Sequence, residues 1–253
     1  MIRRELEHFF AALRFFTRLP VPAWVGHSSA GLNAAARWFP AVGALIGALA
    51  ALAYVLAAQL WPPAIALLLS MAASIYLTGA FHEDGLSDTV DGLGGGWEKQ
   101  RILEIMKDSR IGNYGAIALW LALSGKFALL TAQTPALLPA ILIAGHGFSR
   151  ACSVSLLAAL DYVREDALTK AKPLATRLSP GALLFALGCG LLPLALLPWQ
   201  QALSGLALAI LATFWLARKF RRWLGGYTGD CLGATQQVAE IAFYLGLLAQ
   251  WPL

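Results

Sequence analysis

Apolar stretches long enough to cross a lipid bilayer set the strongest limit on the fold of this chain. A transmembrane helix needs about 17–25 mostly apolar residues to cross about 30 Å of hydrocarbon. Seven stretches approach that length, at about 41–60, 62–81, 115–133, 136–158, 181–198, 201–217 and 236–251. The last two are short, so six spans stay open beside seven. The sequence predicts an all-α, polytopic integral membrane protein with six to seven transmembrane helices, in a single domain over residues 1–253.

Composition supports this class of protein. The chain is 58% hydrophobic and only 13% charged, whereas a soluble domain is about a quarter charged. An aqueous globule cannot bury so much apolar surface. Cys152, Cys189 and Cys231 are scattered, which indicates small apolar side chains rather than a disulfide framework or a metal site.

The N-terminal segment, residues 1–40, begins MIRRELEHFFAALRFFTRLP. Its first helical pattern has one apolar face with basic residues around it, and the face contains Leu6, Phe9, Phe10, Leu13 and Phe16. This arrangement is typical of an amphipathic helix that lies among the lipid headgroups and not of a cleaved leader.

Basic residues predict the orientation in the membrane. Of nineteen Lys and Arg, five lie in 1–40 and four each in 82–114, 161–180 and 218–235, while the alternate connections have none. The positive-inside rule therefore places these segments and the N-terminus in the cytoplasm. Because the basic residues are dispersed over four segments, a nucleic-acid partner is not expected.

The densest acidic stretch is FHEDGLSDTVDGLGGG, residues 81–96. A helix that continued the second apolar span would put Asp84, Asp88 and Asp91 on one face, with neighbouring Cβ atoms about 5–6 Å apart. Like charges repel at that spacing, and the C-terminal end of a helix is already negative. We therefore expect Mg²⁺ to offset them, with Asp88 bridging in a two-metal site. An acidic solvated loop or a structural calcium-like site is the alternative.

Glycines and cations in the same 82–114 segment suit a phosphate ligand. Gly85 and Gly92 lie near one helical face and would let a phosphate approach the backbone, while three further glycines at 94–96 end the helix. Lys107 and Arg110, beside Asp108, are candidates for binding phosphate oxygens. Ordinary surface pairing is the alternative for these cations.

A second polar segment, GGYTGDCLGA at 225–234, precedes the last apolar stretch within the Gly-rich loop 218–235. Thr228 and Asp230 could contact phosphate or metal there, and a simple helix-entry turn explains the same residues equally well.

Three ionisable residues lie inside apolar stretches, where an unpaired charge costs about 2.5 kcal/mol or more. They are Lys126, Arg150 and Glu240. They either line a cleft that admits an anionic substrate, or pair with one another, or snorkel to the membrane surface from near the end of a span.

Four motifs, FFTRLPVP, HEDGLSDTVDG, IMKDSRIGNYG and GGYTGDCLGA, occur in this order. Together they closely resemble the adenosylcobinamide-GDP ribazoletransferase family, also called cobalamin synthase or cobalamin-5′-phosphate synthase. The resemblance covers essentially the whole chain. It implies a Mg²⁺-dependent membrane transferase that completes the nucleotide loop of cobalamin. Such an enzyme joins adenosylcobinamide-GDP to α-ribazole or α-ribazole 5′-phosphate and releases GMP.

The resemblance also implies roles for single residues, first for the three aspartates as metal ligands and then for the polar residues of the later motifs. These are Asp84, Asp88 and Asp91, then Lys107, Asp108 and Arg110, then Thr228 and Asp230. Ala80, Ser87 and Asn113 depart from the residues that such motifs more often contain, namely Gly, Ala and Thr.

The implied reaction needs a base for the ribose 3′-hydroxyl of α-ribazole. Asp91, Glu83 and His82 are the candidates, and the sequence does not decide among them. His82 without any chemical role is an equal alternative.

Other functions remain alternatives. A CDP-alcohol-type phosphotransferase acting on a lipid also uses clustered aspartates, but its D-G-x-x-A-R signature is absent. A multi-span transporter is less compatible with an acid cluster at the cytoplasmic edge and with a sequence in which no inverted repeat is visible. A scaffold for late corrinoid enzymes leaves the aligned aspartates unexplained. A homo-oligomer, or a complex with such enzymes, is left open.

Overall fold

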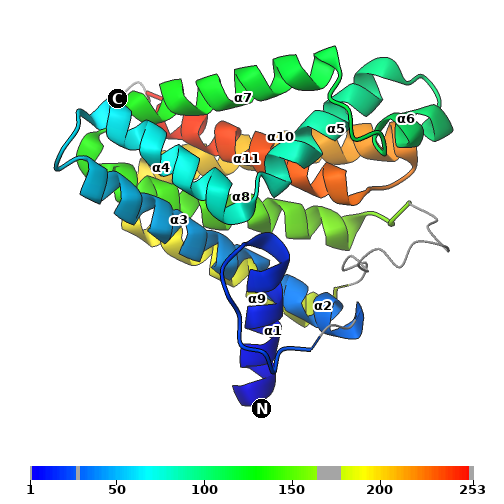
Figure 1. The fold of residues 1–253 in the computed structure, drawn as a ribbon, viewed down its shortest axis with the longest axis horizontal. Helices are drawn as coiled ribbons and strands as arrows, with labels where there is room; N and C mark the ends of the chain where they lie inside the picture. The colour runs from blue at the N-terminus through cyan, green and yellow to red at the C-terminus, as the bar shows by residue number, and fades with distance from the viewer. Residues whose placement is uncertain (1, 27–28, 164–177, 251–253) are drawn as a thin grey trace.

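The computed structural model describes residues 2–26, 29–163 and 178–250, and this part of the chain folds into eleven α-helices (Figure 1). They are α1 (Ile2–Phe16), α2 (Ser29–Ala35), α3 (Phe39–Ala57), α4 (Pro63–Thr78), α5 (Phe81–Gly95), α6 (Lys99–Ile105), α7 (Asn113–Thr131), α8 (Leu138–Ala159), α9 (Pro180–Leu191), α10 (Trp199–Leu224) and α11 (Gly229–Leu247). Three short 3₁₀ helices occupy Ala36–Trp38, Pro135–Leu137 and Leu192–Leu196. The described residues contain only one isolated β-bridge, between Tyr162 and Tyr227. The all-α prediction is confirmed.

Four helical segments of the described chain are long and apolar enough to cross a membrane, judged by length and composition. They are Gly31–Ala57, Asn113–Thr131, Pro135–Ala159 and Trp199–Leu224. The helices α4 and α5 meet the same test only as a pair, which is bent by 84° and would make a fifth span. The predicted stretches at 181–198 and 236–251 fall on the shorter α9 and on α11, which carries polar residues. The count of six to seven spans stays a prediction.

Small residues let the long helices approach closely. α3 packs along α8, and α10 packs along α11. A Cβ added to Gly43 or Gly47 of α3 would collide with the α8 backbone at His146 or Leu142. Because these positions carry no side chain, the two helices cross at backbone contact, as is common in membrane bundles.

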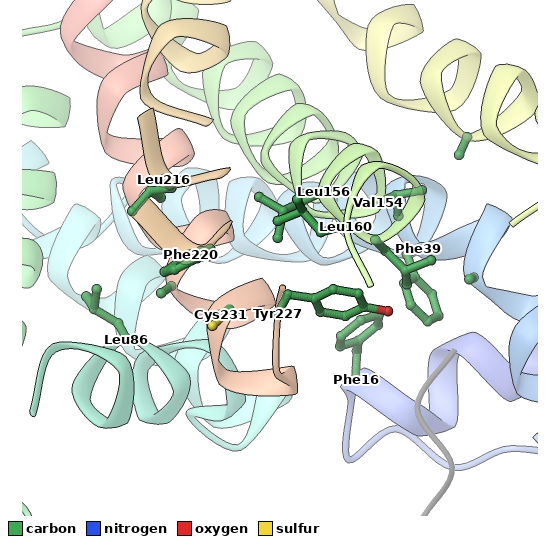
Figure 2. Close-up of a cluster of buried hydrophobic side chains, with 14 of the residues drawn as sticks. Phe16, Phe39, Leu86, Val154, Leu156, Leu160, Leu216, Phe220, Tyr227 and Cys231 are labelled. Atoms are coloured by element: carbon green, nitrogen blue, oxygen red, sulfur yellow. The ribbon is translucent and has the colours of Figure 1, made fainter. Parts of the chain in front are cut away.

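A hydrophobic cluster joins the N-terminal helix α1 to the turn between α10 and α11 (Figure 2). It brings Phe16 of α1 and Phe39 of α3 together with Phe220 of α10 and Tyr227 of the following turn. Residues near the two ends of the chain therefore share one core.

The charged segments 82–114 and 218–235 lie at one end of the bundle, while α1 and α2 lie below its middle in the view of Figure 1. Figure 1 shows the α5–α6 pair, the C-terminal end of α8 and the α10–α11 turn at this end. The α3–α4 and α7–α8 links and the C-terminal end of α11 lie at the other end. Residues 164–177, which hold most of the charges predicted at 161–180, lie outside the described residues. The one-sided distribution agrees with the charge pattern of the sequence.

α1 is the amphipathic helix that the sequence predicts, but much of its apolar face contacts protein. Leu13 and Phe16 are buried, and the helix packs against α2 and α3. An ion pair of 2.6 Å between Glu5 and Arg37 links it to the segment that precedes α3. Its position among lipid headgroups stays a prediction.

Candidate active site

The acidic motif begins a new helix and does not continue the preceding one. α4 ends at Thr78, and Gly79 and Ala80 both adopt left-handed backbone conformations, with φ of 65° and 58°. α5 then starts at an angle of 84° to α4. The predicted helical continuation is therefore wrong, because one helix ends at Thr78 and a separate helix begins at Phe81. Glu83 and Asp84 lie in the first turn of α5, where the helix dipole favours negative charge.

The N-terminal FFTRLP motif packs against this break. The backbone N–H of Arg18 donates to the carbonyl of Leu77 over 2.8 Å. The Arg18 guanidinium lies 5.4 Å from the ring centre of Tyr76 and occupies the space beside Gly79. The first motif of the chain thus contacts the residues that redirect α5.

The three aspartates of α5 differ in environment. Asp84 is exposed, Asp88 is half-buried, and Asp91 is only 8% exposed. The Asp91 carboxylate accepts the backbone N–H of Gly112 over 2.8 Å and that of Gly115 over 2.9 Å. It therefore satisfies the first turn of α7, and a side chain at either glycine would collide with it.

These contacts bear on how the aspartates could hold a metal. In the described part of the chain, no group of three or more His, Cys, Asp or Glu side chains is arranged to bind a metal ion. Mg²⁺ is commonly bound by one or two carboxylates, with water and substrate phosphate completing its ligands. Asp84 and Asp88 fit that requirement better than Asp91, whose two oxygens already accept hydrogen bonds. The three-aspartate magnesium site stays a prediction.

The second polar segment meets the acidic helix. A Cβ on Gly85 of α5 would lie 3.0 Å from the Asp230 carbonyl and 3.2 Å from the Gly233 Cα, both on α11. Reciprocally, a Cβ on Gly233 would lie 3.2 Å from the carbonyl of His82. The two motifs, about 150 residues apart, therefore touch at backbone distance.

Packing accounts for both glycines that the sequence associates with phosphate. Gly85 faces α11, and a Cβ on Gly92 would lie 3.1 Å from the Ile102 carbonyl and press on the Met106 side chain. A substrate contact at either glycine stays a prediction. The glycines at 94–96 do end α5, which stops at Gly95.

Thr228 and Asp230 begin α11. The Thr228 side chain is fully buried and accepts the backbone N–H of Cys231 over 3.3 Å, so Thr228 caps the helix. Asp230 lies in the first turn, where its charge complements the helix dipole. The helix-entry role is confirmed for Thr228, and contacts of either residue with phosphate or metal stay predictions.

The cations after α6 are accessible. Arg110 donates from its Nε to Asp108 Oδ1 over 3.0 Å and from a terminal nitrogen to Oδ2 over 2.7 Å. These bonds lower the pKa of Asp108 to about 2. The Arg110 side chain is 87% exposed and Lys107 is also exposed, so both can reach a ligand in solution.

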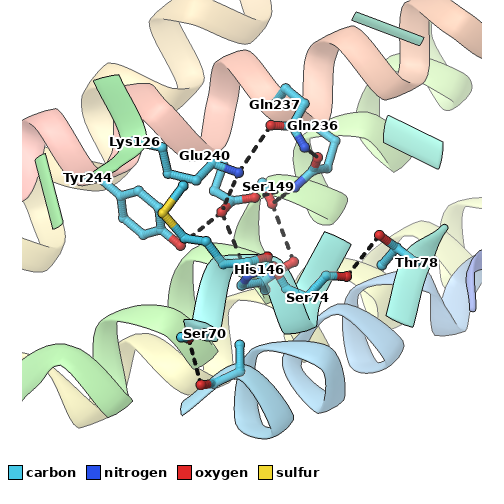
Figure 3. Close-up of polar contacts among 12 residues, drawn as sticks. Ser70, Ser74, Thr78, Lys126, His146, Ser149, Gln236, Gln237, Glu240 and Tyr244 are labelled. Carbon is cyan, nitrogen blue, oxygen red and sulfur yellow. Dashed lines mark hydrogen bonds and ion pairs between the residues drawn. The ribbon is translucent and has the colours of Figure 1, made fainter. Parts of the chain in front are cut away.

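The buried ionisable residues form a polar network around Glu240 (Figure 3). Lys126 of α7 lies 3.1 Å from a Glu240 carboxylate oxygen, and the Tyr244 hydroxyl donates to the same oxygen over 3.0 Å. Gln236 donates to the other oxygen over 2.5 Å. Lys126 and Glu240 thus pair with one another, which is one of the alternatives left open by the sequence. A role of Glu240 in substrate binding stays a prediction.

Arg150 is different, because no carboxylate among the described residues pairs with it. It is 2% exposed, donates to the carbonyl of His146 over 2.9 Å, and its Nε has no hydrogen-bond partner. A buried guanidinium without an anion is costly. This arrangement supports the cavity role predicted for Arg150.

Gln237 connects the buried network to the acidic helix. Its side-chain carbonyl accepts from Lys126 over 3.1 Å, and its amide donates to Glu83 Oε1 over 3.0 Å. The second oxygen of Glu83 is buried and has no hydrogen-bond partner. Glu83 is therefore held in place by one oxygen, while its other oxygen is buried without a partner.

The neutral members of this network were not predicted from the sequence. They are His146, Ser149, Gln236, Gln237 and Tyr244. The spacing of Gln236, Glu240 and Tyr244 by four residues within an apolar stretch was the available signal, because it places three polar groups on one helical face.

Comparison with known proteins decides the family. The family described as Cobalamin-5-phosphate synthase matches residues 8–248. The chain belongs to this family. An adenosylcobinamide-GDP ribazoletransferase of Shewanella amazonensis is 47% identical, over 98% of this chain and 97% of the relative. The Leptothrix cholodnii protein of the same name is 48% identical, over 97% and 96% of the two chains. No solved structure matches.

Proposed function

We propose that this chain joins adenosylcobinamide-GDP to α-ribazole or its 5′-phosphate, giving adenosylcobalamin or its 5′-phosphate and releasing GMP. The observation that carries the proposal is the contact between the 82–96 and 225–234 motifs through Gly85 and Gly233. Distant polar motifs that meet at one end of an apolar bundle support a single site. Membership of the family supports the reaction.

The reaction transfers a phosphoryl group. The ribose 3′-oxygen forms a bond to the phosphorus nearer cobinamide, the bond from that phosphorus to the GMP oxygen breaks, and GMP leaves with the electron pair. The hydroxyl proton needs an acceptor. Glu83 suits this role, because Gln237 orients one carboxylate oxygen and the other has no partner. Asp91 suits it less, because both of its oxygens accept backbone hydrogen bonds.

Arg110 and Lys107 supply positive charge for the diphosphate. Arg110 holds Asp108 through two parallel hydrogen bonds, the geometry with which a guanidinium also binds phosphate. Because the pair is exposed, exchange of Asp108 for a phosphate costs little. Arg150 lies deeper and supplies a third cation for an anionic substrate.

Mg²⁺ would be held by Asp84 and Asp88, and when bound it would neutralise charge on the leaving phosphate. Both side chains come from one face of α5, one turn apart. We further propose that the charged end of the bundle faces the cytoplasm of a bacterial inner membrane, as the basic segments favour. Self-association and a complex with late corrinoid enzymes stay predictions.

The test is GMP release by detergent-purified protein given adenosylcobinamide-GDP and α-ribazole 5′-phosphate, with and without Mg²⁺. We expect magnesium-dependent GMP that falls about 100-fold or more in Asp88→Asn. Glu104→Gln, a change at an exposed acid of α6, is the matched control and should retain activity. Wild-type rates in Asp88→Asn would refute the metal role alone. Release of CMP from a CDP-alcohol, without GMP formation, would refute the proposed reaction.

A further inference from the structure

An apolar groove of about 350 Å³ lies between α5, α7, α10 and α11. Its walls are mainly apolar side chains, and those from α5 include Leu86, Val90 and Leu93. With about 3.6 residues in each helical turn, these three side chains lie on the face of α5 opposite to the three aspartates. The apolar groove is therefore separate from the acidic face of α5.

A basic groove on α10 adjoins the apolar groove. Trp215 and Lys219 line both of them, and the basic groove is open and measures about 580 Å³. Its remaining walls are Arg218, Arg221, Arg222 and Trp223. Within the described part of the chain, no carboxylate forms an ion pair with any of these four cations. The two grooves thus share a boundary that is apolar on one side and positively charged on the other.

Aromatic rings lie beside the cations of the basic groove. Lys219 Nζ lies 5.2 Å from the ring centre of Trp215, and the Arg218 guanidinium lies 5.8 Å from that of Phe214. Both rings are exposed, and so is Leu211, one turn before Trp215. An exposed apolar helix face that ends in tryptophan and cations is typical of the boundary between membrane and water. This arrangement suits the depth at which lipid phosphates lie.

The apolar groove also contains a polar atom without a partner. Thr89 of α5 lines the groove and is 2% exposed, and its hydroxyl has no hydrogen-bond partner among the described residues. Buried polar groups nearly always have a partner. The ester carbonyl of a phospholipid, which lies between the acyl chain and the phosphate, would accept a hydrogen bond from this hydroxyl.

We propose that the two grooves together bind one anionic phospholipid of the bilayer. Its acyl chain lies in the apolar groove, and its phosphate lies among Arg218, Lys219 and Arg222. Basic residues at a membrane surface attract anionic lipids, so charge complementarity selects the headgroup. The helix dipole accounts for cations in the last turn of α10, but not for the adjoining apolar groove. The bound chain packs on α5 and so supports the helix whose other face carries the aspartates.

Native mass spectrometry of the detergent-purified full chain tests the headgroup site. The probes are palmitoyl-oleoyl phosphatidylglycerol and palmitoyl-oleoyl phosphatidylcholine, which have the same acyl chains and differ in net charge. The wild type should bind phosphatidylglycerol about tenfold more tightly. The triple variant Arg218→Gln/Lys219→Gln/Arg222→Gln should lose this preference. Arg101→Gln is the matched control and should keep it, because Arg101 is an exposed cation of α6 that lines neither groove.

A second pair of variants tests the acyl-chain site. Ala118→Leu places a larger side chain inside the apolar groove, so it should weaken the binding of both lipids about tenfold. Ala116→Leu changes an exposed position of the same helix outside the groove, and it should bind both lipids as the wild type does. Melting curves of the same preparations show whether each variant is folded.

Several outcomes would overturn the inference, and none of them depends on turnover. Equal binding of the two lipids by the wild type would exclude selection by charge. An unchanged preference in the triple variant would place the phosphate elsewhere, and wild-type binding by folded Ala118→Leu would place the chain outside the groove. Displacement of phosphatidylglycerol by inorganic phosphate or by GDP would assign the cations to a soluble phosphate ligand instead of a lipid.

Discussion

Acids on the neighbouring helices α11 and α5 differ in burial and in pairing. Glu240 of α11 is fully buried, and its oxygens receive Lys126, Gln236 and Tyr244. Asp84 of α5 is exposed at the end of the bundle. Burial makes an unpaired charge too costly, so the interior pairs its acids, while acids at the surface remain available for ligands. Position in the bundle thus separates acids that are paired inside the protein from acids that remain accessible.

Glu83 lies at the boundary between these groups. One of its oxygens is tied to the buried network through Gln237, and the other has no partner. The comparison therefore predicts that stability and activity can be changed separately by substitutions on the two sides of Glu83.

The largest loss of stability is expected for substitution of Glu240, inside the buried network. Glu240→Gln leaves the Lys126 ammonium buried without its carboxylate, which should lower the free energy of unfolding by about 3–5 kcal/mol. Denaturation of the purified protein in mixed detergent micelles would measure it. The double variant Lys126→Met/Glu240→Gln should regain part of the loss, because no charge is stranded. Equal stability of the wild type and Glu240→Gln would contradict the pairing.

For Glu83, we expect substitution to lower kcat and to leave stability nearly unchanged. Glu83→Gln removes the proposed proton acceptor but keeps the size of the side chain, so kcat should fall about 100-fold. Its melting temperature should stay near that of the wild type, since the acceptor for Gln237 is retained. GMP release and melting curves of the same preparations check both halves. A stability loss as large as that of Glu240→Gln would place Glu83 within the structural network instead.

Substitution of Ala80, just before α5, should raise the free energy of unfolding instead of lowering it. Ala80 has a left-handed φ of 58°, which is costly for a residue with a Cβ. Ala80→Gly should therefore stabilise the protein by about 0.5–1 kcal/mol, after allowing for the greater freedom of glycine in the unfolded chain. Ala118→Gly, within the regular helix α7, should destabilise by about 1 kcal/mol and serves as the control.

The smallest effect belongs to the exposed Asp108–Arg110 pair. The pKa of Asp108 is lowered from 3.8 to about 2 by the Arg110 hydrogen bonds, so its contribution is fully present above pH 3.8. That contribution is lost as the pH falls through about 2. The stability difference between wild type and Asp108→Asn should therefore be small, constant from pH 5 to 8 and absent in strong acid. A difference that changes near neutral pH would contradict this assignment.

Sequence patterns were sufficient to predict the helices and to locate the polar motifs. Apolar length and charge asymmetry act locally along the chain, so the all-helical membrane fold and its one charged end follow from them. The break at Gly79–Ala80 was missed because Ala80 is an unusual residue for a left-handed position. Periodicity alone predicts a continuous helix there.

The partners of the charged residues could not be predicted in the same way. The pairing of Lys126 with Glu240, and the Gln237 bridge to Glu83, depend on contacts between residues more than one hundred positions apart. The capping of α7 by Asp91 likewise depends on how α5 and α7 pack. Such choices are made by tertiary geometry, which hydrophobic spacing does not encode.

A small pocket lined by Phe16, Phe81 and Gly229 brings together α1, α5 and the beginning of α11. During synthesis, Phe16 leaves the ribosome more than two hundred residues before Gly229, so one wall of the pocket must wait for the other. A nascent chain released before residue 229 would contain the whole acidic helix and still lack a wall against which it packs. Only chains that extend through α11 can complete the backbone contact between Gly85 and Gly233.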